Sequence, residues 1–194
     1  MRRAEHGRGA ASPVSIPVAI RIATPADAVL LADLGSRTFR EAFASANTPG
    51  DMDMYIAASF SPGRQAAELA EPGNTFLLAE REHTPVGYAH LRGGPSPECV
   101  AGAHPVELVR IYAVRQWIGH GIGTALMDTC IETGRDRGHD VLWLGVWEQN
   151  PRAIQFYHSW GFVTVGSHPF LLGTARQTDF VMQRGLQEHQ HRRP

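Results

Sequence analysis

Residues 109–130 read VRIYAVRQWIGHGIGTALMDTC, in which an apolar run typical of a strand leads through three alternate glycines into a run with helical periodicity. Glycine permits positive φ angles and a close approach of the backbone to a ligand. The N–H groups at a helix start can hold an anion, aided by the helix dipole. The turn at Gly119, Gly121 and Gly123 is therefore a candidate phosphate site, although packing alone is an equally good explanation of such a turn.

Two common phosphate-binding motifs do not fit this turn. The P-loop needs Gly-Lys-Ser/Thr, and the chain has no lysine, because all 18 of its basic residues are arginine. The missing lysine also excludes Schiff-base chemistry. The dinucleotide fingerprint needs G-x-G-x-x-G in an early βαβ unit, whereas these glycines are spaced G-x-G-x-G late in the chain.

A second block, LWLGVWEQNPRAIQFYHSWGF at residues 142–162, follows the glycine turn. Together the two segments resemble the GNAT superfamily of N-acetyltransferases. The turn is similar to the coenzyme A pyrophosphate loop, Gln/Arg-x-x-Gly-x-Gly/Ala, with Ile118 at the usually polar first position. The second block is similar to the family's Asn-x-x-Ala-x-x-Phe-Tyr-x-x-x-Gly-Phe, which is matched in register by Asn150, Ala153, Phe156, Tyr157, Gly161 and Phe162.

The resemblance implies an α/β (α+β) GNAT fold, in which helices flank a central, mixed and mostly antiparallel sheet that splays between its fourth and fifth strands. A length of 194 residues fits one domain. We expect that domain at residues 18–186, with flexible tails at 1–17 and 187–194. The first tail contains an arginine pair but lacks the apolar region of a signal peptide.

Local signals predict the individual elements. Strands are expected near 18–22, 75–80, 86–91, 106–114 and 140–147, with FVTVG (162–166) and TDFVM (178–182) closing the sheet. Helices are expected from residue 25 past 43, within 51–60, at 124–137 and after Asn150, which is a candidate N-cap with Pro151 in the first helical position.

The resemblance also implies acetyl-CoA as cosubstrate, without a metal. It aligns the pantetheine arm with Tyr112, Ala113 and Val114, where the Val114 N–H is a candidate donor to the thioester oxygen. Asn150 would contact the same arm, or act only as a helix cap. The pyrophosphate would lie on the backbone of residues 119–124, namely Gly119, His120, Gly121, Ile122, Gly123 and Thr124.

Acetyl transfer to an amine needs an acid for the departing thiolate and a base for the amine. The resemblance gives the acid role to Tyr157, and a phenol with a pKa near 10 can protonate a thiolate with a pKa near 8.5; packing in the core is the alternative role. An alkyl amine is only about 1 part in 2,500 neutral at pH 7, so a base should help. Glu107 and Glu148 are the candidates, and both are also compatible with solvated surface carboxylates.

Four segments, ELVRIYAV, LGVWEQN, GSHPFLLG and QTDFVM, resemble the polyamine N-acetyltransferases of the PaiA type. They imply transfer to a primary amine of a small molecule, such as a polyamine, by direct attack on the thioester. His168 and Asp179 lie in these segments without an assigned role. Two alternatives stay open: a non-catalytic, coenzyme A-binding regulatory module, and an acetyltransferase that acts on a protein or peptide amine.

The composition also limits which other partners and which cell compartment are expected. The net charge of −1 gives no indication of nucleic acid, and no apolar run approaches the ~20 residues that span a bilayer. Cys99 and Cys130 have no metal or redox spacing and are interpreted as reduced thiols, which favours a cytoplasmic location. A homodimer is compatible with the fold.

Overall fold

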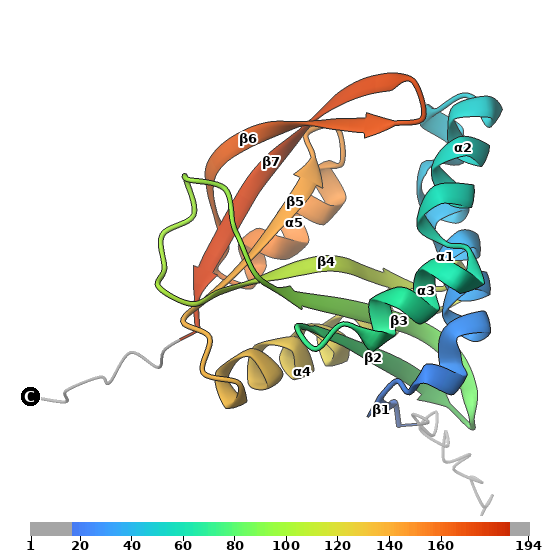
Figure 1. Cartoon of the computed structure of the whole chain (residues 1–194), viewed down its shortest axis with the longest axis horizontal. Coiled ribbons are helices and arrows are strands. Elements are labelled where there is room, and N and C mark those ends of the chain that lie inside the picture. Colours follow the sequence, from blue (N-terminus) through green and yellow to red (C-terminus); the bar gives the residue numbers. More distant parts are fainter. Residues whose placement is uncertain (1–16, 187–194) are drawn as a thin grey trace, which may run out of the picture.

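The computed structural model describes residues 17–186, so the tail expected at 1–17 lies outside the described residues except for its last residue, and the tail expected at 187–194 lies wholly outside them. The described chain forms one seven-stranded sheet with helices on both faces (Figure 1). The strands are β1 (Ala19–Ile22), β2 (Asn74–Arg81), β3 (Thr84–Gly93), β4 (Pro105–Ala113), β5 (Val141–Trp147), β6 (Val163–Leu172) and β7 (Ala175–Gly185). The α-helices are α1 (Ala28–Phe43), α2 (Pro49–Ser59), α3 (Pro62–Ala70), α4 (Ile122–Asp136) and α5 (Pro151–Ser159).

The strand order β1-β2-β3-β4-β5-β7-β6 contains one parallel pair, β4 with β5. That pairing covers only three residue pairs, from Pro105 with Val141 to Glu107 with Trp143. Beyond Glu107 the two strands no longer pair, and Figure 1 shows their ribbons diverging. The expected fold, a mixed and mostly antiparallel sheet that splays between its fourth and fifth strands, is confirmed.

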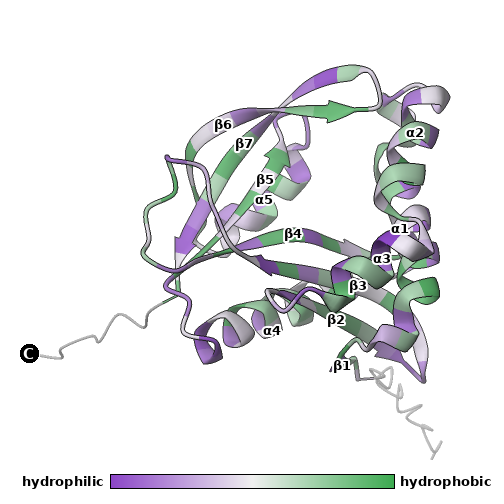
Figure 2. Cartoon of the chain, viewed as in Figure 1, coloured by the Kyte–Doolittle hydropathy of each residue, from purple (hydrophilic) through white to green (hydrophobic). Residues whose placement is uncertain are grey.

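The helices divide between the two faces of the sheet. One face packs on α4 and α5, around a core that includes Leu126, Met127 and Leu144. The other face packs on α1 to α3, through clusters around Leu31 and Phe39. β5 is largely hydrophobic, whereas the β6–β7 hairpin alternates hydrophilic and hydrophobic segments (Figure 2). On the α1–α3 side, the cluster around Phe39 reaches across the splay, because both Tyr112 of β4 and Leu172 of β6 belong to it or pack on it.

Three expected elements differ from the structure. Helix α4 begins at Ile122 rather than Thr124, because its N-cap, Gly121, adopts a left-handed φ of 82°. Helix α3 was not expected, although Ser61 caps it and Pro62 occupies its first position. Strands β6 and β7 extend well beyond FVTVG and TDFVM, because they pair with each other along almost their whole length as a long hairpin.

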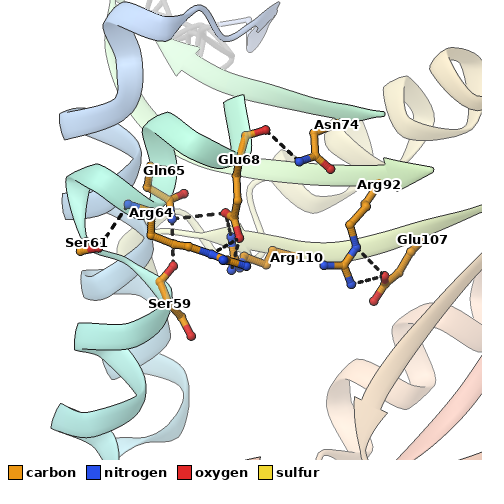
Figure 3. A network of polar contacts seen from close by, with 9 residues as sticks. All are labelled: Ser59, Ser61, Arg64, Gln65, Glu68, Asn74, Arg92, Glu107 and Arg110. Atoms are coloured by element: carbon orange, nitrogen blue, oxygen red, sulfur yellow. Dashed lines mark hydrogen bonds and ion pairs between the residues drawn. The ribbon is translucent and has the colours of Figure 1, made fainter. Parts of the chain in front are cut away.

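A buried ion pair joins α3 to β4 (Figure 3). Arg110 Nη1 lies 2.8 Å from Glu68 Oε2, and both side chains are less than 10% exposed. Arg64 contacts the other carboxylate oxygen of Glu68 at 2.9 Å, and the Arg110 guanidinium stacks on the Phe60 ring with 4.9 Å between the guanidinium carbon and the ring centroid. This network fixes the helical layer on the strand that borders the splay.

Candidate active site

The glycine turn forms the N-terminus of α4. Gly119 and Gly121 both adopt left-handed φ angles, 86° and 82°, which L side chains rarely adopt. The first helical hydrogen bond runs from the Ala125 N–H to the Gly121 carbonyl, so the N–H groups of Ile122, Gly123 and Thr124 precede the hydrogen-bonding pattern of the helix. A Cβ added to Gly119 or Gly121 would meet nothing within 4 Å. The turn therefore leaves open space beside three N–H groups, which suits an anion.

One predicted member of the turn is engaged elsewhere. The His120 N–H donates to the Trp117 carbonyl at 3.2 Å, so the expected contact between this backbone N–H and the phosphate is wrong. The imidazole is exposed and lies against the Trp117 ring. Ile118, at the usually polar position, is 39% exposed.

The end of β4 borders the splay. The Val114 N–H donates to the Val86 carbonyl of β3 at 2.9 Å, so the expected donor role of this N–H toward a thioester is wrong. The reason is the strand register: successive N–H groups of a strand point to opposite edges, and that of Val114 points to β3. The neighbouring Ala113 N–H consequently faces the β5 edge, which carries no strand pairing here.

Helix α5 brings Asn150 and Tyr157 to the other side of the splay. The Asn150 side chain accepts a hydrogen bond from the Ala153 N–H at 3.1 Å, so its predicted capping role is confirmed. Tyr157 is partly buried and packs on Phe156 and Phe162. Tyr112 approaches the splay from the α1–α2 side, where its ring contacts Phe39 and Phe43.

The Tyr157 phenol is suited to donating a proton. Burial, together with the nearby Cys130, raises its pKa well above the ordinary value, so the phenol keeps its proton at neutral pH. Within residues 17–186, no hydrogen bond holds its hydroxyl group. Burial also raises the pKa of Tyr112 strongly. Tyr157 packs on the core of the α4–α5 face, whereas Tyr112 packs on the clusters of the α1–α3 face.

A hollow of about 340 Å³ opens beside the end of β5, between the α1–α2 connection and β7. We refer to it as the acceptor hollow, and its polar lining includes Asn47, Thr48, Asp51, Glu148, Gln149, Arg176, Gln177 and Thr178. The lining contains two carboxylates, Asp51 and Glu148, and one guanidinium, Arg176. The hollow therefore combines a modest negative charge with many hydrogen-bonding groups.

The two predicted bases, Glu107 and Glu148, and two nearby aspartates differ in how many partners hold their carboxylates. Glu107 accepts two hydrogen bonds from Arg92, at 2.6 and 3.1 Å, and lies on the part of β4 that is still paired with β5 (Figure 3). Asp51 accepts hydrogen bonds from the Thr174 N–H and the Thr48 hydroxyl, which hold its pKa below the ordinary value. Asp53 pairs with Arg40. Glu148 is exposed in the acceptor hollow, so it is the freest of these carboxylates.

Two residues without an assigned role lie at the site as well. In the sheet register, His168 of β6 lies opposite Asp179 of β7, and Asp179 lies opposite Trp147 of β5. Their side chains therefore share the face of the sheet that contains Trp147, which lines the acceptor hollow. Among the described residues, no group of three or more His, Cys, Asp or Glu side chains is arranged to hold a metal ion.

Comparison with known proteins gives a consistent result. The family model described as the acetyltransferase (GNAT) family matches residues 37–162. An uncharacterised N-acetyltransferase of Mycobacterium tuberculosis is 35% identical over 160 residues, which cover 82% of this chain and 98% of that protein. The structure of PaiA N-acetyltransferase from Thermoplasma acidophilum in complex with coenzyme A has a TM-score of 0.70 at 19% identity and covers 87% of this chain and 99% of that chain.

An acetyltransferase of Salmonella typhimurium, solved with its cofactor acetyl-CoA, is also similar. Its TM-score is 0.58 at 25% identity, and the match covers 89% of this chain and 96% of that chain. No helix within residues 17–186 is both long and apolar enough to cross a membrane.

Proposed function

The chain belongs to the acetyltransferase (GNAT) family and is an acetyl-CoA-dependent N-acetyltransferase, and from this premise we propose that its acceptor is a primary amine of a small cationic molecule, a polyamine such as spermidine. The acceptor hollow carries the proposal, because it opens at the end of β5 next to the splay and has two carboxylates in its lining. The PaiA-type enzymes that the chain resembles act on polyamines, and a cationic polyamine suits a lining with two carboxylates.

In the proposed reaction, the N–H groups of residues 122–124 bind the pyrophosphate of acetyl-CoA, and the β4 edge at Ala113 and the Asn150 side chain hold its pantetheine arm. The observed turn fits this role, because it offers open space, unpaired N–H groups and the positive end of α4. The neutral amine attacks the thioester carbon directly, and the C–S bond breaks as Tyr157 gives its proton to the thiolate sulfur. Glu107 and Glu148 remain candidates for the base, although Glu107 forms an ion pair with Arg92.

Replacing Gly121 with Asp tests the phosphate site. We expect coenzyme A affinity to fall by more than about tenfold, a loss of ~1.4 kcal/mol, because a carboxylate would then lie against the pyrophosphate. Isothermal titration calorimetry with coenzyme A measures the change.

Two further variants separate charge from backbone strain. Gly121→Asn has nearly the same shape without the charge, and we expect a smaller loss of affinity. Gly138→Asp places the same residue at a left-handed φ of 78° at the opposite end of α4, where an added Cβ also meets nothing within 4 Å; its affinity should match the wild type. Equal affinities for Gly121→Asp and Gly138→Asp would rule out this turn as the phosphate site.

The cationic acceptor predicts a salt dependence. Attraction between exposed charges is screened over ~10 Å at 0.1 M ionic strength and over ~3 Å at 1 M. With spermidine as acceptor, kcat/KM from thiol release should therefore decrease as salt is added, mainly through KM for the amine. A neutral amine at the same concentrations serves as the control, and its kcat/KM should change less.

The acceptor class is tested with a panel of polyamines, amino acids, aminoglycosides and peptides with free N-termini. We expect the highest kcat/KM for a polyamine. Product from a neutral or anionic amine, with none from polyamines, would contradict the polyamine assignment. A preference for peptides would instead favour the alternative acceptor, a protein or peptide amine.

A further inference from the structure

The centre of β5 contains a glycine that the backbone does not require. Gly145 lies between the buried residues Leu144 and Val146 but is itself exposed, and its φ is not in the left-handed region. Glycine weakens a strand, and within one it often marks a place where a ligand approaches closely. Gly145 therefore indicates a surface on β5 that is kept open.

Two side chains from neighbouring strands converge above this surface. A Cβ on Gly145 would lie 3.1 Å from His168 Nε2 and 3.4 Å from Asp179 Oδ2. Any larger residue at position 145 would crowd both groups. The space above Gly145 is thus bounded by an imidazole nitrogen and a carboxylate oxygen.

Both of these atoms can act as hydrogen-bond acceptors. The His168 Nδ1 atom lies 3.1 Å from the Pro169 carbonyl oxygen, and an Nδ1–H that donates to it leaves Nε2 with a free lone pair. An ionised carboxylate only accepts hydrogen bonds, whereas a primary ammonium group has three donors. Two convergent acceptors above an exposed glycine are a suitable arrangement for a primary ammonium group.

Asp179 is also poorly satisfied by the protein itself. Its Oδ1 atom is buried and has no hydrogen-bond partner among the described residues. The pKa of this carboxyl group is raised to about 6, mainly by burial, while the nearby His168 lowers it and the nearby Glu148 raises it. Asp179 also contributes to the raised pKa of Tyr55 of α2, although burial is the main cause of that shift.

We propose that Asp179 is the general base of the acetyl transfer, and that it acts with His168 above Gly145 to receive the primary ammonium group of the acceptor. The assignment rests on the proposed function. It makes the proposed function more specific, because it assigns the base to Asp179 of β7 in place of the two candidates Glu107 and Glu148. Glu107 is held by Arg92 at 2.6 Å, and Glu148 is exposed, whereas the Asp179 carboxylate is half-buried and its Oδ1 atom has no hydrogen-bond partner among the described residues.

The protons balance in this scheme. Asp179 takes one proton from the ammonium group, and the nitrogen lone pair forms the C–N bond with the thioester carbon. The C–S bond then breaks, and the thiolate takes the Tyr157 proton. The nitrogen loses its second proton as the amide forms, and this proton restores the Tyr157 phenol. Asp179 releases the first proton to solvent, so the products are the acetamide, coenzyme A and one proton.

The pH dependence follows from the sign of the shift. Asp179 must be ionised to accept a proton, so kcat/KM of the wild type with spermidine should fall about tenfold per pH unit below about pH 6. In Asp179→Asn, only amine that is already neutral reacts. Its kcat/KM should be roughly 10²-fold lower at pH 7 and should rise about tenfold per pH unit toward the amine pKa near 10.4.

The folded state of this variant should be intact. Because the pKa of Asp179 is raised in the folded protein, its ionisation opposes folding increasingly as the pH rises from about 4, the ordinary pKa of an aspartate, to about 6, and fully above that range. Asp179→Asn should therefore unfold at a temperature no lower than the wild type and should bind coenzyme A with unchanged affinity. Asp53→Asn, which alters an exposed carboxylate paired with Arg40, is the matched control and should keep the wild-type profile.

Gly145→Ala supplies an independent test, since its methyl group would occupy the space in front of both acceptors. KM for spermidine should rise at least about tenfold while coenzyme A affinity stays unchanged, as calorimetry would verify. An active wild type whose Asp179→Asn variant keeps both its rate and its pH profile would overturn the assignment of Asp179 alone. A wild type that acetylates no amine would overturn the proposed function, and the assignment with it.

Discussion

Tyr157→Phe should lower kcat by roughly 10²–10⁴, the usual contribution of a positioned general acid or base. The substitution removes one oxygen and keeps the ring, which packs on Phe156 and Phe162. The proton matters only as the C–S bond breaks, so the loss should be in kcat and not in KM for acetyl-CoA. Steady-state kinetics of thiol release with saturating amine measure both parameters.

Tyr88→Phe is the matched control for this prediction. Tyr88 is fully buried, and its hydroxyl has no hydrogen-bond partner among the described residues. Burial raises the pKa of this phenol as well, so the two tyrosines differ mainly in their place beside the splay. The kcat of Tyr88→Phe should stay near that of the wild type. If Tyr157→Phe also remained within about threefold of the wild type, solvent would supply the proton and Tyr157 would be a packing residue.

Glu68→Ala should lower the free energy of unfolding by about 3–5 kcal/mol, the usual cost of breaking a buried ion pair from one side. The substitution leaves the Arg110 guanidinium, itself only 9% exposed, without its carboxylate partner. Arg64 loses its partner too, but it is half exposed and can be solvated. Urea unfolding monitored by circular dichroism measures the change.

An exposed pair on the same side of the protein provides the comparison. Asp53→Ala removes one partner of the Arg40–Asp53 pair, whose side chains are 50% and 66% exposed. The loss should be below about 1 kcal/mol. The double variant Glu68→Leu/Arg110→Met should recover much of the stability, because an apolar pair avoids the desolvation cost. A Glu68→Ala variant as stable as Asp53→Ala would mean that water reaches Arg110.

Local patterns predicted a large part of the fold, including the glycine turn that begins α4 and the Asn150 cap that begins α5. The glycine turn and the Asn150 cap depend on residues within a few positions of one another, so backbone preferences alone indicate them. Helix α3 had equally local signals in Ser61 and Pro62. They were missed because a Pro-Gly dipeptide, here Pro62 and Gly63, is also typical of a turn.

The acceptor side depends on strand register, which local patterns do not determine. The Val114 N–H faces β3 because of how β3 and β4 align, with a register shift between His90 and Leu91. Asp179 meets His168 through the register of the β6–β7 hairpin, and the two lie above Gly145 because β7 inserts between β5 and β6. The available signal was Gly145, a glycine in the middle of an otherwise apolar strand.

The central claim is that this chain moves the acetyl group of acetyl-CoA to a primary amine. The most direct measurement incubates the full chain with acetyl-CoA and spermidine, and quantifies free thiol and N-acetylated product, by thiol titration and mass spectrometry, in the same samples. We predict one thiol released for each N-acetyl group formed, at a rate proportional to protein concentration. Coenzyme A binding without acetylation of spermidine or of any other amine in the panel would contradict the account and leave a binding module in its place.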